Sequence, residues 1–196
     1  MANKIRYGIK NVYYAIATLG SDNTATYATP VALPGAVSLS LDAEGDNNIF
    51  YADNIAYFQT YGNNGYSGSL ELALLPEAFR RNVLGEILDN KSVLVENQNA
   101  TSVHFALLFQ FEGDDKAVKH IIYNCTASRP AVSGQTKEAS VEPQTETIDI
   151  TATSIHVAAI NADVVKAKTG DNTDTTTYNG WFSAAYVPAG LPSATT

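Results

Sequence analysis

Residues 103–111 read Val-His-Phe-Ala-Leu-Leu-Phe-Gln-Phe and carry the strongest β pattern of the chain. One face of this run would hold Val103, Phe105, Leu107, Phe109 and Phe111, and the other face His104, Ala106, Leu108 and Gln110. A period of two is typical of an extended strand, because its successive side chains point to opposite faces. The run therefore predicts a central β-strand.

Working outward from this strand, the same period recurs along most of the chain. A turn at 112–116 and a β-rich run at 118–126 predict a long hairpin over 103–127. Residues 37–42 and 67–74 alternate in the same way and predict a second pair of strands. Further strands are expected at 7–18, 91–96, 145–153 and 180–187, with the polar 145–153 segment at an edge of its sheet.

One helix is expected, at about 76–89. Pro76 suits a first-turn position, Glu77 complements the helix dipole, and apolar residues from Phe79 to Leu88 recur at helical spacing. This stripe is the kind that packs on a sheet. The chain is thus expected to be mainly β, with one flanking α-helix.

Composition and charge exclude several functions. Only 16% of the residues are charged and the formal net charge is −8, which disfavours a domain that grips nucleic-acid phosphates with Lys and Arg. Cys125 is the single cysteine, so an intrachain disulfide and a cysteine-based zinc site are both excluded, and we expect it to be a buried, inert thiol. No run of about 18 apolar residues occurs, and no membrane partner is expected.

The sequence also lacks the signatures of an enzyme. His104, His120 and His156 are isolated, and neither a phosphate-binding loop nor a dinucleotide fingerprint occurs. The acidic groups Asp42-x-Glu44-x-Asp46 and Asp171-x-x-Asp174 lack the spacing of a calcium loop. We therefore expect no enzymatic activity, no catalytic residue, no metal and no cofactor.

The segment at about 43–66 links two predicted strands and is unusually long for a loop. It carries five aromatic rings, at Phe50, Tyr51, Tyr57, Phe58 and Tyr61. Two interpretations stay open: a partner or another copy covers these rings, or the segment adds strands to the sheet of its own domain. Residues 36–75 hold no Lys or Arg, whereas Lys4, Arg6 and Lys10 make the N-terminal arm, about 1–10, basic.

In its order of motifs the chain resembles the major tail proteins of long-tailed, siphovirus-type bacteriophages. The resemblance rests on Ile5-Arg-Tyr-Gly-Ile-Lys-Asn-Val-Tyr-Tyr-Ala-Ile-Ala17, on Thr29 to Leu41, on Phe50-Tyr-Ala-Asp-Asn54, and on the closing Trp181-Phe182. It implies a β-sandwich or barrel-like tail-tube fold in one domain over 1–190, followed by a disordered tail at 191–196. It also implies stacked hexameric rings that form the tail tube, through which DNA passes during ejection without tight binding.

The resemblance further implies partners and surfaces. The partners would be other copies of the chain, the tape measure protein, the tail terminator and the baseplate hub proteins, with synthesis in the host cytoplasm and final location in the virion tail. It places the 43–66 segment between rings, so the expected interface residues are Lys4, Arg6, Phe50, Tyr51, Tyr57, Phe58 and Tyr61. The alternating strand faces give the expected lumen-facing set: Ser38, Ser40, Asp42, Ser69, Glu71, Gln110, Glu112, Asn124 and Thr126.

A second class of function stays open. A carbohydrate- or host-binding β-sandwich of a virion would also be acidic, rich in Thr and Asn, and aromatic on its loops. Trp181 could then serve as the stacking platform, although its place in a predicted strand favours packing in the core.

Overall fold

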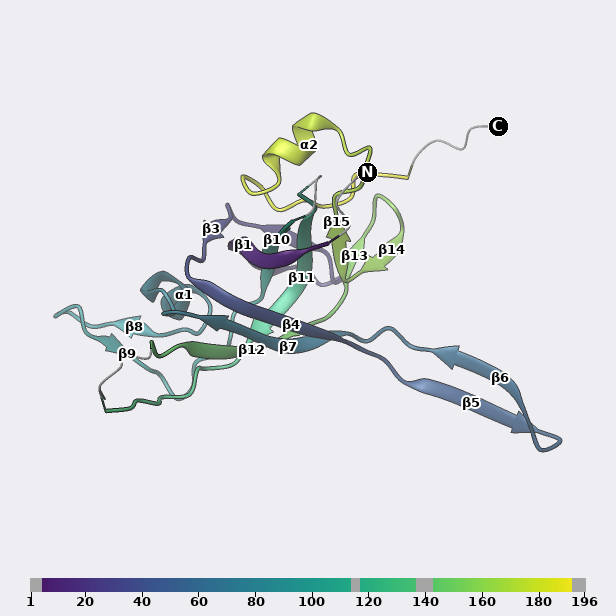
Figure 1. Cartoon of the computed structure of the whole chain (residues 1–196), viewed down its shortest axis with the longest axis horizontal. Coiled ribbons are helices and arrows are strands. Elements are labelled where there is room, and N and C mark those ends of the chain that lie inside the picture. Colours follow the sequence, from purple (N-terminus) through teal and green to yellow (C-terminus); the bar gives the residue numbers. More distant parts are fainter. Residues whose placement is uncertain (1–4, 114–116, 137–142, 192–196) are drawn as a thin grey trace.

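Residues 105–110, the buried part of the run at 103–111, lie in a central strand of a nine-stranded antiparallel sheet (Figure 1). The computed structural model describes residues 5–113, 117–136 and 143–191. The main path of the sheet is β2-β1-β10-β11-β12-β7-β4, with β3 paired to β1 and β15 paired to β11. Its strands are β1 (Tyr7–Leu19), β2 (Ala25–Tyr27), β3 (Val31–Ala32), β4 (Ala36–Glu44), β7 (Gly65–Leu72), β10 (Phe105–Glu112), β11 (Lys119–Ala127), β12 (Glu146–Ala152) and β15 (Lys166–Lys168).

Three two-stranded sheets and two short helices complete the described part of the chain. The small sheets are β5 (Asn47–Ala52) with β6 (Ile55–Tyr61), β8 (Ile87–Leu88) with β9 (Leu94–Val95), and β13 (Ile155–Val157) with β14 (Ala162–Val164); the helices are α1 (Glu77–Asn82) and α2 (Thr175–Gly180). The mainly β fold with a flanking helix is confirmed. The pairing of 37–42 with 67–74 and the hairpin over 103–127 are confirmed as well.

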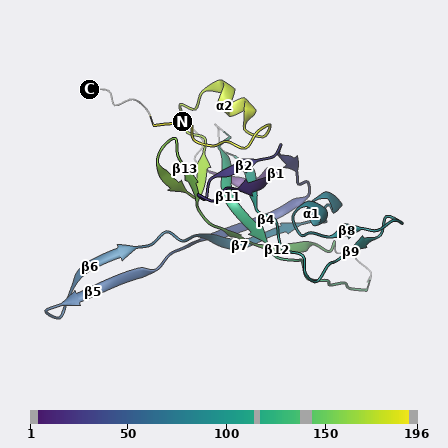
Figure 2. The same ribbon diagram turned by 180° about the vertical axis from the view of Figure 1, so that it is seen from behind.

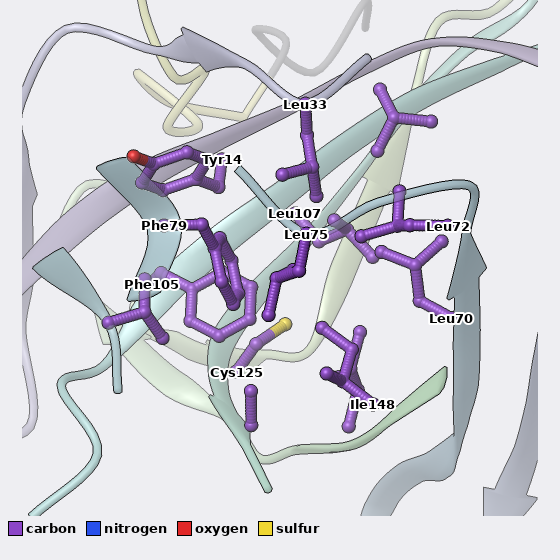
Figure 3. Packing of buried hydrophobic residues seen from close by; sticks show 14 of the residues in the cluster. Tyr14, Leu33, Leu70, Leu72, Leu75, Phe79, Phe105, Leu107, Cys125 and Ile148 are labelled. Carbon is purple, nitrogen blue, oxygen red and sulfur yellow. The ribbon is translucent and has the colours of Figure 1, made fainter. Parts of the chain in front are cut away.

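The sheet curls, because β4 at one end of the strand order also lies against β1 near the other end. The inside of the curl holds the larger core (Figure 3), where the Phe79 ring packs edge-on against Tyr14 at 5.0 Å and against Phe105 at 5.6 Å between ring centres. A second core covers the other face of β10 and β11 with Ile155 and Trp181. Because both faces of β10 are covered, its residues from Phe105 to Gln110 are all buried.

The flanking helix is shorter than the predicted 76–89. Helix α1 ends at Asn82, and Gly85 follows in a left-handed conformation (φ +75°) that turns the chain away from the helix axis. Ile87 and Leu88, which the helical spacing had included, pair instead with β9. Only the first part of the apolar stripe therefore packs in the core: Phe79 and Val83 are buried, whereas Ile87 is 55% exposed.

The C-terminal part of the chain also differs from the prediction. The segment 180–187, predicted as a strand, instead holds the last residue of α2 followed by turns and irregular chain. The Asp174 side chain caps this helix by accepting from the Thr177 backbone N–H at 2.9 Å. The 91–96 strand shrinks to Leu94–Val95, and β12 is not an edge strand, since it lies between β11 and β7.

Two of the small sheets lie at opposite ends of the molecule. Strands β5 and β6 extend away from the body beyond β4 and β7, and β8–β9 lies at the other end (Figures 1 and 2). Strand β1 begins at Tyr7, within the segment predicted as the N-terminal arm, about 1–10. Among the described residues, no helix has the length and apolar character that a membrane crossing requires.

Candidate assembly surfaces

The β5–β6 hairpin is a separate two-stranded sheet that does not join the nine-stranded one. Its turn residues, Asp53 and Asn54, both have positive φ angles, of 51° and 61°. Two consecutive residues of this kind make the tight turn that matches the twist of a β-hairpin, and Asp and Asn tolerate the conformation. Strands β5 and β6 therefore do not add to the main sheet, although residues 43–44 and 65–66 at the two ends of the segment extend β4 and β7 within it.

The hairpin presents its aromatic side chains to solvent. Phe50 lies opposite Phe58 across the strand pair, and both are about as exposed as their neighbours. The exposed fractions are Phe50 61%, Tyr51 63%, Ile55 60%, Tyr57 71%, Phe58 60% and Tyr61 73%. An isolated two-stranded hairpin is only marginally stable in water, and an apolar patch of this kind usually marks a surface that binds another protein.

A second surface is formed by the outer face of β4 and β7. Ser38 lies opposite Glu71, Ser40 opposite Ser69, and Asp42 opposite Ser67, while the alternate residues of both strands point into the core. Glu71 accepts hydrogen bonds from Thr145 Oγ1 at 2.7 Å and from Ser38 Oγ at 2.8 Å. These bonds, that from Thr145 above all, lower the pKa of the Glu71 carboxyl below its ordinary value.

Strand β12 extends this surface with residues that the sequence analysis did not assign. Thr147 lies opposite Glu71, Asp149 opposite Ser69, and Thr151 opposite both Ser67 and Thr126. We call this combined surface the hydroxyl–carboxylate face: Ser38, Ser40, Asp42, Ser67, Ser69, Glu71, Thr126, Thr147, Asp149 and Thr151. The alternation at 145–151 already predicted a strand with one polar face. Only the pairing of β12 with β7 brings that face beside the polar residues of β4 and β7.

Three of the expected lumen residues do not belong to this face. Gln110 is only 5% exposed and accepts a hydrogen bond from Asn11 Nδ2 at 3.1 Å. Glu112, at the end of β10, is exposed but lies opposite Tyr7 and forms an ion pair with Lys10 at 3.1 Å. The expectation was wrong for Gln110 because β10 lies in the middle of the sheet, with packed elements on both of its faces.

Asn124 is the third expected lumen residue that lies outside this face, and its side chain instead stabilises a bulge in β11. It is 6% exposed and has a positive φ of 47°, at the place where the pairing of β10 with β11 shifts register. Its side chain lies 2.7 Å from His104 Nδ1 and donates to Thr153 Oγ1 at 2.7 Å and to the Ser154 carbonyl at 3.2 Å. This bulge lets both Ile122 and Cys125 enter the same core.

The remaining candidates are placed as follows. Arg6 is exposed, and its guanidinium carbon lies 5.1 Å from the centre of the Phe111 ring. Lys4 lies outside the described residues. Cys125 is fully buried, as expected, and burial raises the pKa of its thiol to about 12. Over the described ranges of the chain, no group of three or more His, Cys, Asp or Glu side chains could hold a metal ion.

Trp181 cannot act as a platform for a sugar ring in this structure. It is 2% exposed, stacks on Tyr186 at 5.0 Å between ring centres, and donates from Nε1 to the His120 carbonyl at 3.3 Å. Its packing in the core confirms the preference of the sequence analysis for that role. The carbohydrate-binding alternative therefore loses the residue suggested as its stacking platform.

Comparison with known proteins finds only remote similarity. No protein-family model and no curated protein sequence matches the chain. Among solved structures, it is similar to a chain in the cryo-EM structure of the anti-feeding prophage cap (AFP tube terminating cap), with 13% identity, a TM-score of 0.45, and coverage of 84% of this chain and 93% of that one. It is also similar to a chain of the anti-feeding prophage (AFP) baseplate, 6-fold symmetrised, with 10% identity, a TM-score of 0.41, and coverage of 85% and 98%. Both likenesses are distant, and neither identifies a function for this chain.

Proposed function

We propose that this protein is a structural subunit of a bacteriophage tail, which assembles with copies of itself into stacked hexameric rings that form the tail tube. The observation that carries the proposal is the β5–β6 hairpin, which projects from a completed core with its aromatic rings in solvent. The strands of this hairpin pair only with each other and not with the nine-stranded sheet. The hairpin is therefore available to connect one copy to the next.

Large exposed rings suit an interface core. Tyr and Phe bury much area with few rotatable bonds, and a few such anchors dominate the energy of most interfaces. The rings of this hairpin are clustered rather than scattered over the molecule. In the proposed tube they become buried between rings of subunits, which also covers the marginal two-stranded sheet.

The free edge of β4 supports lateral assembly within a ring. Strand β4 pairs with β7 and with no other described strand, so its outer edge offers unpaired backbone groups. Such an edge can pair with a strand of a neighbouring copy. The four strands that a subunit would contribute to a shared barrel are then β4, β7, β12 and the end of β11, rather than β10.

The hydroxyl–carboxylate face supports the role of conduit. Strands β4, β7 and β12 contain no Lys or Arg, so a wall built from this face repels phosphates and gives them no cation to bind. DNA would slide along such a wall without tight binding. We propose that this face lines the lumen, and that no catalytic step is involved.

The proposed partners follow from this role. They are other copies of the chain, the tape measure protein inside the tube, the tail terminator at one end and the baseplate hub proteins at the other. The protein would be made in the host cytoplasm and end in the tail of the virion.

Electron microscopy of the purified protein across a concentration series, paired with light scattering, tests the proposal. We expect the native chain to form hollow tubes of uniform width. The Tyr57→Ser/Phe58→Ser variant should remain folded, because both rings are already exposed, but should form no tubes. Val132→Ser, which removes a fully exposed apolar side chain outside the hairpin, should assemble normally.

Two outcomes would contradict the proposal. Tubes formed by Tyr57→Ser/Phe58→Ser at the native concentration would show that the hairpin rings do not connect subunits. A native chain that stays monomeric at high concentration, and that instead binds immobilised glycans, would favour the carbohydrate-binding class.

A further inference from the structure

A groove of about 300 Å³ lies beside the free edge of β4. Three consecutive β4 residues, Leu39 to Leu41, form one wall, and β10, β11 and β15 contribute to the others. This volume reaches the lower end of the range for pockets that hold drug-sized ligands, so a single aromatic side chain fits within it. The Tyr57→Ser/Phe58→Ser variant changes no residue of this groove.

The groove is lined by cations and aromatic rings. Arg6 lies over Phe111, and Lys166 Nζ lies 4.5 Å from the centre of the Tyr66 ring. His120 stacks on Phe109 at 5.1 Å between ring centres, with an angle of 6° between the planes. Arg6 and Lys166 are both exposed, so their charges face whatever enters the groove.

The β5–β6 hairpin has the complementary chemistry. It carries two carboxylates, Asp46 just before β5 and Asp53 in the turn, and residues 45–62 contain no Lys or Arg. The same segment carries the exposed rings, which can pack against the ring-lined walls of the groove. The hairpin extends away from the body in both views, so the match is with another molecule rather than with its own groove (Figures 1 and 2).

The fit of the hairpin does not need the unpaired edge of β4, which the proposed ring gives to the neighbouring copy. The groove walls from β10, β11 and β15 remain for the hairpin. Ring packing would anchor the hairpin there, and the opposite charges would set its register and suppress wrong partners.

We propose that the groove beside β4 is the docking site for the β5–β6 hairpin of a second copy of this chain. The hairpin places its rings against Phe109, Phe111 and Tyr66, and its carboxylates approach Arg6 and Lys166. This inference rests on the proposed function, since it names the surface that receives the hairpin in the assembled tube.

A charge swap tests the pairing. Arg6→Glu/Lys166→Glu should raise the protein concentration needed for tube formation by about tenfold, because two exposed attractions become repulsions. Asp46→Lys/Asp53→Lys should do the same from the hairpin side. The variant that combines all four changes restores opposite charges at every contact and should assemble within about threefold of the native concentration.

Lys91→Glu is the matched control, because Lys91 is an exposed cation in the β8–β9 turn at the other end of the molecule. It should assemble like the native chain, and circular dichroism should show every variant to be folded. Native-like assembly of Arg6→Glu/Lys166→Glu would overturn the inference, as would a failure of the combined variant to recover. Loss of tubes in Lys91→Glu alone would place the docking site at the β8–β9 end instead.

The two failures are distinguishable. If Tyr57→Ser/Phe58→Ser abolishes tubes while the groove variant does not, the proposed function stands and only the docking site is wrong. If neither change affects assembly, both proposals fail together.

Discussion

Asn124→Ala should destabilise the protein far more than its position near the end of β11 implies. The side chain makes three hydrogen bonds in a buried setting, to His104, Thr153 and the Ser154 carbonyl. At about 1 kcal/mol each, their loss lowers the free energy of unfolding by about 3 kcal/mol. The positive φ of 47° adds about 1–2 kcal/mol for an alanine, so the expected total is about 4–5 kcal/mol.

Asn124→Gly separates the two contributions. The glycine variant loses the same three hydrogen bonds, but glycine adopts the left-handed conformation without strain. Its greater conformational freedom in the unfolded chain costs about 0.4–1 kcal/mol, which offsets part of the relief from strain. We therefore expect the glycine variant to be roughly 1 kcal/mol more stable than the alanine variant.

Urea unfolding followed by circular dichroism measures both values, with equal slopes required for a valid comparison. An alanine variant within about 0.5 kcal/mol of the native chain would refute the claim that the buried hydrogen bonds stabilise the bulge. A glycine variant less stable than alanine would refute the claim that the backbone conformation matters there.

Two further predictions concern single groups. The Cys125 thiol is buried with its pKa raised to about 12, so at pH 8 a maleimide should label it at less than about a hundredth of its rate in urea, and rapid labelling of the native chain would contradict its placement in the core. The Glu71 carboxyl has its pKa lowered chiefly by Thr145, so it contributes stability above its ordinary pKa and loses that contribution as the pH falls through the lowered value. Thr145→Ala should move the pKa of Glu71 up toward its ordinary value in an NMR titration, and should destabilise the protein more at pH 7 than at pH 3; equal effects at both would argue against the hydrogen bond.

The sequence by itself determined the features that depend on neighbours along the chain. The period of two predicted the long strands, including β10 and β11, because it reflects the geometry of an extended backbone. It also predicted two of the strand pairs, that of 37–42 with 67–74 and the hairpin over 103–127. The aromatic content of the 43–66 segment left two interpretations open, and only the family resemblance favoured an association surface, a prediction that the exposure of the rings supports but does not test.

Only the tertiary structure decided which faces are buried, because that depends on elements far apart in the sequence. Gln110 was assigned to a solvated face, yet a strand in the middle of a sheet that is covered on both sides has none. The helix stops at Asn82 because Gly85 turns the chain, although the apolar spacing continues to Leu88. Strand β12 joined the hydroxyl–carboxylate face through its pairing with β7, across a separation of more than 70 residues that no local pattern encodes.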